Sequence, residues 1–252
     1  MKTAATAAAF AVLSSSAFAQ NLSASLPDSV GTVAPALETY VGEILFAQEW
    51  NNEALAPRDR ALVTFAATLT RHETDAIGRH ITVALDSGVT PAELSETITH
   101  LAFYTGLENA IAAAEAAAPI FAERGVSPDD LPPASPDLLP LNEQAEAARE
   151  AMVQGNFGDV SQGVVDHTRD VLFHDLWLRP DLAPRDRSLI TVAALIAAGQ
   201  PEQMSFHLNR AMDNGLSQEE AGGMLSHLAF YTGWPKVFSA MPVAKQVFES
   251  RQ

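Results

Sequence analysis

The seven residues His100-Leu-Ala-Phe-Tyr-Thr-Gly106 occur again, letter for letter, as His227-Leu-Ala-Phe-Tyr-Thr-Gly233, 127 positions further along the chain. The same offset, kept without a gap, places Pro57-Arg-Asp-Arg60 on Pro184-Arg-Asp-Arg187 and His80 on His207. From position 57 to 117, 22 of 61 aligned positions are identical. A gapless match of this length indicates one duplicated domain and not a solenoid of short repeats.

The apolar residues of both halves recur at steps of three and four, as in amphipathic helices. The strongest helix signal is Thr90-Pro91-Ala-Glu93, a capping box with Pro at the first helical position, and Gly88 and Gly106 are suited to end helices. No segment alternates with the period of two that a strand requires. The predicted fold class is therefore all-α, with helices over 33–50, 58–69, 74–88, 91–104, 107–122, 142–154, 160–177, 185–198, 201–215, 218–232 and 235–248.

The domain organisation follows from composition. Residues 1–19 have a basic start, an apolar middle and an Ala17-Phe-Ala19 ending, which predict a secretory signal peptide cleaved after Ala19 and a periplasmic or secreted protein. The two repeats occupy 33–122 and 142–250. Five prolines between Gly125 and Leu141 predict an extended linker over 123–141.

Charge and cysteine content restrict the function. The formal net charge of −16 argues against binding to nucleic acid or to anionic membrane surfaces. The chain contains no cysteine, so disulfides and thiol chemistry are excluded.

His80 and His207 are the first candidates for catalysis. Each lies on a helix side that otherwise carries apolar or small residues, and Gln203 is placed one turn before His207. Partial removal from water lowers the pKa of an imidazole and makes it a usable proton shuttle. The alternative is a core histidine bonded to a backbone carbonyl.

His100 and His227 form a second histidine pair, each four residues before a tyrosine, Tyr104 or Tyr231. Imidazole and phenol therefore share one helix face. Glu96 extends this face in the first repeat, whereas Gly223 replaces it in the second. The pattern suits either a binding site or a packing contact with polar tips.

The remaining polar motifs allow two interpretations. No metal-binding histidine motif and no phosphate-binding loop is present, so neither a metal nor a cofactor is predicted. The arginines of the repeated Arg-Asp-Arg motif, notably Arg185 and Arg187, could bind a substrate carboxylate or form salt bridges between helices.

A longer run of residues carries a family resemblance. The segment from Trp177 to Leu195, with Glu202-Gln-Met-Ser-Phe-His207, Gly215 and Ala229-Phe-Tyr-Thr-Gly233-Trp-Pro235, resembles the carboxymuconolactone decarboxylase family. That family shares its helical fold with the alkylhydroperoxidase D-like proteins. The resemblance covers 142–249 well and 45–118 more loosely.

This resemblance implies a cofactor-free decarboxylase, or a related lyase or isomerase, acting on a small lactone or keto-acid carboxylate. His207 would transfer the proton, Gln203 and Glu202 would orient it, and His80 would be an equivalent or vestigial site. Arg185 or Arg187 would hold the substrate carboxylate, with His227, Tyr231, His100 and Tyr104 nearby. The resemblance also implies a ring, such as a trimer of tandem chains.

Two features qualify the resemblance. The Cys-x-x-Cys pair of the peroxidase branch is replaced by Gln200 and Gln203 in one repeat and by Glu73 and Ala76 in the other, so peroxide reduction by thiols is excluded. An exported protein also predicts a substrate different from that of a cytoplasmic decarboxylase. The rival hypothesis is a non-catalytic helical binding or assembly module.

Overall fold

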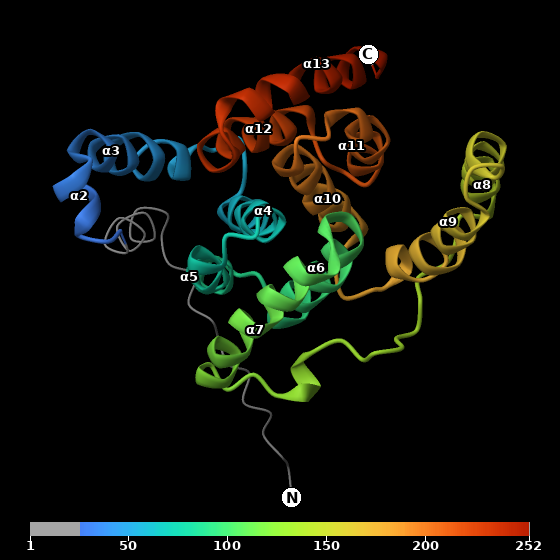
Figure 1. Cartoon of the computed structure of the whole chain (residues 1–252), viewed down its shortest axis with the longest axis horizontal. Helices are drawn as coiled ribbons and strands as arrows, with labels where there is room; N and C mark the ends of the chain where they lie inside the picture. Colours follow the sequence, from blue (N-terminus) through green and yellow to red (C-terminus); the bar gives the residue numbers. More distant parts are fainter. Residues whose placement is uncertain (1–25, 252) are drawn as a thin grey trace, which may run out of the picture.

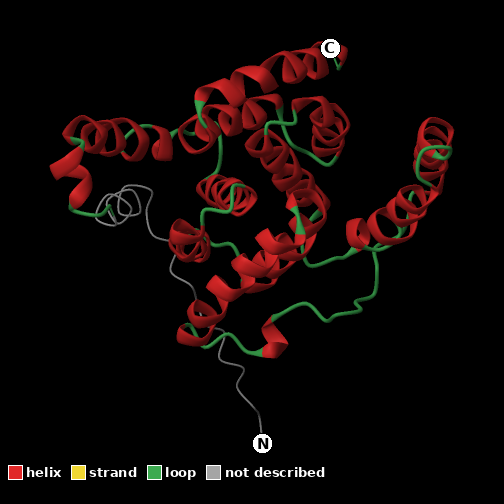
Figure 2. Ribbon diagram, viewed as in Figure 1, coloured by secondary structure: helices red, strands yellow, loops and turns green. Residues whose placement is uncertain are grey.

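The fold was analysed in a computed structural model, which describes residues 26–251. The predicted signal peptide over 1–19 lies outside the described residues. Within the described part of the chain there is no strand, and the prediction of an all-α tandem duplication is confirmed (Figure 2). No helix of this part has both the length and the apolar character needed to cross a membrane.

The first repeat contains α2 (Ser29–Val33), α3 (Pro35–Tyr40), a π-helical turn (Val41–Phe46), a 3₁₀ turn (Glu49–Asn51), α4 (Pro57–Thr70), α5 (Thr74–Asp86), α6 (Pro91–Thr105) and α7 (Leu107–Glu123). The predicted capping box at the start of α6 is present in full. The single helix predicted over 33–50 is divided instead. Ala34 precedes Pro35, and a residue before proline disfavours the helical conformation.

The second repeat follows a linker whose one helical turn is Pro128–Asp130, and opens with an additional helix, α8 (Glu143–Phe157). It continues with α9 (Gln162–His167), a π-helical turn (Thr168–Phe173), a 3₁₀ turn (Leu176–Leu178), α10 (Pro184–Ala198), a 3₁₀ turn (Pro201–Gln203), α11 (Met204–Asp213), α12 (Gln218–Thr232) and α13 (Trp234–Ser250). The π-helical turns of the repeats occupy positions 127 residues apart. The duplication therefore extends to irregular backbone.

The two repeats share one hydrophobic core. α4 and α10 pack against each other at its centre, α10 also packs against α6, and α12 packs against α4 (Figure 1). Both central helices are buried on nearly all sides, which small residues such as Ala66, Ala67, Ala193 and Ala194 allow. The sequence periodicity predicted one side of each helix as apolar; the fold buries the other sides against the opposite repeat.

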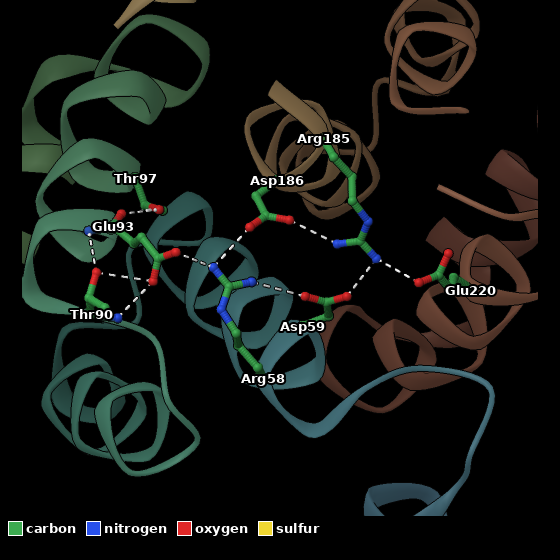
Figure 3. A network of polar contacts seen from close by, with 8 residues as sticks. All are labelled: Arg58, Asp59, Thr90, Glu93, Thr97, Arg185, Asp186 and Glu220. Carbon is green, nitrogen blue, oxygen red and sulfur yellow. Dashed lines mark hydrogen bonds and ion pairs between the residues drawn. The ribbon is translucent and has the colours of Figure 1, made fainter. Parts of the chain in front are cut away.

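The repeated Arg-Asp-Arg motifs meet across this centre (Figure 3). Arg58 contacts Asp186 at 2.8 Å, and Arg185 contacts Asp59 at 2.6 Å, so each pair joins one repeat to the other. Each arginine also contacts the aspartate that follows it in its own helix. The network continues to Glu93 and Glu220, the capping residues of α6 and α12. It thus ties four helix N-termini together.

Replacement of Asp186 by Asn should lower the free energy of unfolding by about 2–4 kcal/mol, because two arginines lose their charged acceptor in a mostly buried site. Urea denaturation measures this change. The matched control is Glu249→Gln, which breaks an exposed pair with Lys245 and should cost less than about 1 kcal/mol. Equal effects of the two substitutions would contradict the proposed importance of the central network.

Candidate active site

Polar and aromatic side chains from both repeats gather in two clusters that the duplication relates. The first, here the His207 cluster, combines residues of both repeats: Glu96, His100 and Tyr104 with Trp177, Arg187, Thr191, His207 and Arg210. The second, here the His80 cluster, has the reverse composition: Trp50, Arg60, Thr64 and His80 with His227 and Tyr231. Each cluster is therefore completed by the other repeat.

Hydrogen bonds between the repeats fix one ring nitrogen in each cluster. His100 Nε2 lies 2.8 Å from Thr191 Oγ1, and His227 Nε2 lies 2.7 Å from Thr64 Oγ1. Each threonine hydroxyl already donates to a carbonyl oxygen of its own helix, of Arg187 or of Arg60. The hydroxyl oxygen must therefore accept, and both histidines carry their proton on Nε2.

His100 and His227 are fully buried, and both remain uncharged. Burial lowers the pKa of His100 well below its ordinary value, and the neighbouring Arg187 lowers it further. The pKa of His227 is lowered in the same way, by burial and then by Arg60. Both imidazoles are therefore neutral at neutral pH.

Tyr104 is held as a hydrogen-bond donor. The indole Nε1 of Trp177 donates to Tyr104 Oη over 2.9 Å, which leaves the phenolic proton for another acceptor. Burial raises the pKa of Tyr104, so the phenol stays protonated at neutral pH. In the second cluster Trp50 donates to Tyr231 over 3.0 Å. The tryptophan in each cluster thus orients a tyrosine from the other repeat.

His207 lies between these aromatic groups. Its ring stacks on Trp177 at 5.5 Å between centroids and meets Tyr104 edge-on at 5.4 Å. Nδ1 is buried and has no hydrogen-bond partner. Burial, with a smaller contribution from Arg210, lowers the pKa of His207 to about 4. His207 is thus a neutral imidazole whose ring nitrogen is not committed to the main chain.

A pocket of about 240 Å³ borders the His207 cluster. Its lining includes Trp177 and Arg210 of the cluster. Phe206 of α11 also lines it, together with Glu146 and Arg149 of α8. The positions of the first repeat that correspond to α8 lie mostly outside the described residues. In the His207 cluster, α8 forms one side of this pocket.

His80 occupies the equivalent place in the other cluster. Its ring meets Tyr231 edge-on at 5.7 Å, its Nδ1 is buried without a hydrogen-bond partner, and burial followed by the charge of Arg79 lowers its pKa to about 4. The core of the twin site is therefore intact. The two sites differ in the residues around it.

The arginines considered for carboxylate binding have partners within the protein. Arg185 belongs to the central network, with Asp59, Asp186 and Glu220 around its guanidinium. Arg187 is fully buried and contacts Glu96 at 2.9 Å. Both side chains therefore act as salt bridges between helices, one of the two interpretations that the sequence left open.

Gln203 and Glu202 lie on a 3₁₀ turn before α11, and both are exposed. The sequence placed Gln203 one helical turn before His207, but α11 begins at Met204. No hydrogen bond joins either side chain to His207 within the described part of the chain. The groups oriented towards His207 are Tyr104 and Trp177 instead.

Each cluster has a buried carboxylate, but at a different position: Glu96 in the His207 cluster, and Glu49, whose Oε1 lies 4.0 Å from His227 Nδ1, in the His80 cluster. In the His207 cluster Glu96 accepts from Arg187 and from Arg179, whose guanidinium also binds the linker carbonyl oxygens of Pro133 and Ala134. Gly223 stands in the place of Glu96 in the His80 cluster. There a Cβ atom would lie 3.1 Å from Ala54 and Leu55, a close contact that the glycine avoids.

Sequence reasoning missed Trp177, Thr191 and Arg210 as site residues. The duplication offered a signal for the first two, since Trp177 matches Trp50 and Thr191 matches Thr64 at the same offset of 127. Arg210 matches Val83, so no repeat pattern marks it. Only the packing of α11 on Trp177 identifies it.

One group of side chains could hold a metal ion. The ligand atoms of Glu146, Glu150 and His174 lie within 4.8 Å of one another. Glu146, however, is bound through both carboxylate oxygens by Arg149. A metal would have to displace this guanidinium, and the cluster is not assigned a metal.

The fold and the clusters define a class: a tandem all-helical protein with two composite histidine–tyrosine sites. The sequence profile of the carboxymuconolactone decarboxylase family matches residues 35–119 and again 162–246. The chain belongs to this family, as its resemblance predicted.

Individual relatives agree with this assignment. The chain is 31% identical over 94 residues to a 4-carboxymuconolactone decarboxylase from Acinetobacter baylyi, covering 37% of this chain and 70% of the relative. It is 31% identical over 71 residues to a nitrosuccinic acid decarboxylase from Metarhizium robertsii, covering 28% of this chain and half of that relative.

A solved structure has the same fold. The crystal structure of a candidate gamma-carboxymuconolactone decarboxylase subunit from Burkholderia xenovorans aligns with 96% of this chain and 100% of its own, at a TM-score of 0.57 and 18% identity. This likeness supports the arrangement of the helices across both repeats.

The buried histidines should make the protein sensitive to mild acid. His80 and His207 have pKa values of about 4 when folded and about 6.5 when unfolded, so the unfolded chain binds more protons between these pH values. Stability is complete above pH 6.5 and decreases as the pH falls towards 4, by about 3 kcal/mol for each histidine.

Urea denaturation at several pH values measures this dependence. His207→Gln should remove about half of the slope that these two residues contribute, whereas replacement of the exposed His167 by Gln should leave the slope unchanged. An unchanged slope in His207→Gln would contradict the neutral, buried state of this imidazole.

Proposed function

We propose that this protein is a cofactor-free decarboxylase, or a closely related isomerase, that acts on a small lactone or keto-acid carboxylate at the His207 cluster. The observation that carries the proposal is the neutral His207 imidazole beside the donor Tyr104, behind Trp177 and Phe206, which line a pocket and both contact His207. The names of both relatives as decarboxylases support the class of reaction.

The chemistry requires two kinds of assistance. Loss of carbon dioxide breaks a carbon–carbon bond and leaves its electron pair on the remaining fragment, where a conjugated carbonyl can accept it as an oxyanion. The fragment then takes a proton at carbon. In an isomerase a proton leaves one carbon and returns to another. Either reaction needs a hydrogen-bond donor to oxygen and a proton carrier near carbon.

The His207 cluster supplies both. The Tyr104 hydroxyl, oriented by Trp177, can donate to the developing oxyanion, and it does so from a site that needs no reorganisation. His207 can deliver or accept the proton. A negatively charged substrate beside the imidazole raises its pKa from about 4 towards neutrality and so stabilises the protonated form during the reaction.

Substitution of His207 by Gln should lower kcat by about 10²- to 10⁴-fold, the usual contribution of general acid–base catalysis. Turnover of carboxylated lactones, followed by carbon dioxide release or ultraviolet absorbance, measures the change. The same substitution at His80 is the matched variant, because it tests whether the twin site shares the work. Full activity of the His207 variant would remove this residue from the mechanism.

A separate observation favours self-association. A groove of about 640 Å³ runs between α12 and α13, and its lining includes Phe230, Trp234, Phe238 and Met241. Trp234 and Phe238 are 50% and 63% exposed. Apolar patches of this kind mark interaction surfaces. We propose that a second copy of the chain covers this face, as expected for the ring that the family resemblance implies.

Replacement of Phe238 by Glu should shift the protein towards the single chain, because a charge would be buried in the apolar contact. Analytical ultracentrifugation measures the mass. The control is Lys245→Glu, which changes an exposed residue that lines the same groove. It should change the mass distribution less. A wild-type protein that sediments as a single chain at micromolar concentration would refute the proposal.

A further inference from the structure

Arg210 differs from the other described basic residues. The other arginine and lysine side chains within residues 26–251 have partners, nearly all of them through hydrogen bonds or ion pairs, whereas no hydrogen bond or ion pair engages the Arg210 side chain. Its Nε is buried without a partner. The guanidinium carbon lies 4.3 Å above the Trp177 ring and 5.8 Å from the Phe173 ring. A largely buried cation is therefore held by aromatic faces alone.

Such an arrangement has a free-energy cost. Burial lowers the pKa of Arg210, a sign that the charged form loses hydration. Contacts with aromatic rings recover about 0.5–2 kcal/mol, less than a carboxylate partner would. A bound anion would recover the remainder.

The carboxylate that lines the same pocket as Arg210 is already engaged. Glu146 lines the same pocket, but both of its oxygens accept from Arg149, and His174 Nε2 lies 3.2 Å from Oε1. Glu146 and Arg149 therefore neutralise each other. The charge of Arg210 is left for a ligand in the pocket.

The position of Arg210 also suits a substrate. It follows His207 by three residues on α11, so the two side chains lie on the same side of this helix, and both contact Trp177. A carboxylate bound at Arg210 would place the rest of a small molecule near Trp177 and Phe206, the pocket residues that contact His207.

We propose that Arg210 recognises a carboxylate that the substrate retains through the reaction. This inference rests on the proposed function and specifies its substrate class. Arg210 binds the carboxylate that stays and not the one that leaves, because an ion pair stabilises a carboxylate in the ground state and would hinder its loss as carbon dioxide. If the reaction is a decarboxylation, the carboxylate that is lost is a second one, which lies away from Arg210.

The duplication gives this feature to one site only. The residue equivalent to Arg210 is Val83, which is buried in the core of the first repeat. The His80 cluster thus keeps the histidine and tyrosine but lacks an arginine at this position. The two sites have diverged in what they recognise.

The test compares binding of an unsaturated five-membered lactone that carries an acetate group with binding of its methyl ester, by isothermal titration calorimetry. The wild-type protein should prefer the acid. Arg210→Gln should weaken binding of the acid by about 10- to 100-fold and leave binding of the ester unchanged, which shows that the pocket is intact. Arg210→Lys should recover part of the loss.

The control is Arg251→Gln, which removes an exposed arginine that pairs with Asp213 at the end of α11 and should bind both compounds like the wild type. Acid binding within about twofold of wild type in Arg210→Gln would overturn the inference. Loss of preference for the acid without any turnover would leave the inference in place and refute the proposed function. Turnover by the wild type, together with an unchanged preference for the acid in Arg210→Gln, would support the proposed function and refute the inference.

Discussion

The structure depends on ion pairs exchanged between the two repeats. Arg58 reaches Asp186 and Arg185 reaches Asp59 where the N-termini of α4 and α10 meet. Four charges in a largely buried place are stable only as a closed set, since removal of one leaves its partners without hydration or counter-charge. The set fixes the two central helices relative to each other and, through Glu93 and Glu220, the starts of α6 and α12. These last two helices carry His100, Tyr104, His227 and Tyr231.

The same exchange between repeats makes the two histidine–tyrosine clusters composite. Each threonine of a central helix accepts from a histidine of the opposite repeat, and each tryptophan donates to the opposite tyrosine. A single repeat would leave these buried groups without partners. The duplication is therefore a requirement of the sites and not a doubling of independent units. Mutual completion gives a physical reason for the repeated histidine and tyrosine of the His100-Leu-Ala-Phe-Tyr-Thr-Gly106 segment.

Around this shared frame the two sites have changed in charge. At the offset of 127 residues, Glu96 corresponds to Gly223, and Arg210 corresponds to Val83. The His207 cluster thus contains a buried carboxylate paired with two arginines, a further arginine with no hydrogen bond or ion pair among the described residues, and helix α8 beside the pocket. Burial holds the histidines and tyrosines of both clusters neutral, so the free charge of the His207 site is that of Arg210. Neutral imidazole and phenol groups beside one cation are the basis of the proposal that the site binds an anionic substrate.

The sequence by itself determined the helical class, the duplication, the capping of α6 and the family, because periodicity, caps and the 127-residue offset are local or repetitive properties. It also selected His207, His80 and the two histidine–tyrosine pairs as candidates. Only the tertiary structure decided that Arg185 and Arg187 pair with carboxylates of the protein, that Gln203 and Glu202 lie on an exposed turn, and that Trp177 and Arg210 adjoin His207. The physical reason is that charge pairing and burial are set by side chains far apart in sequence. For example, the spacing of His207 and Arg210 on one helix does not predict which carboxylates of other helices lie near Arg210.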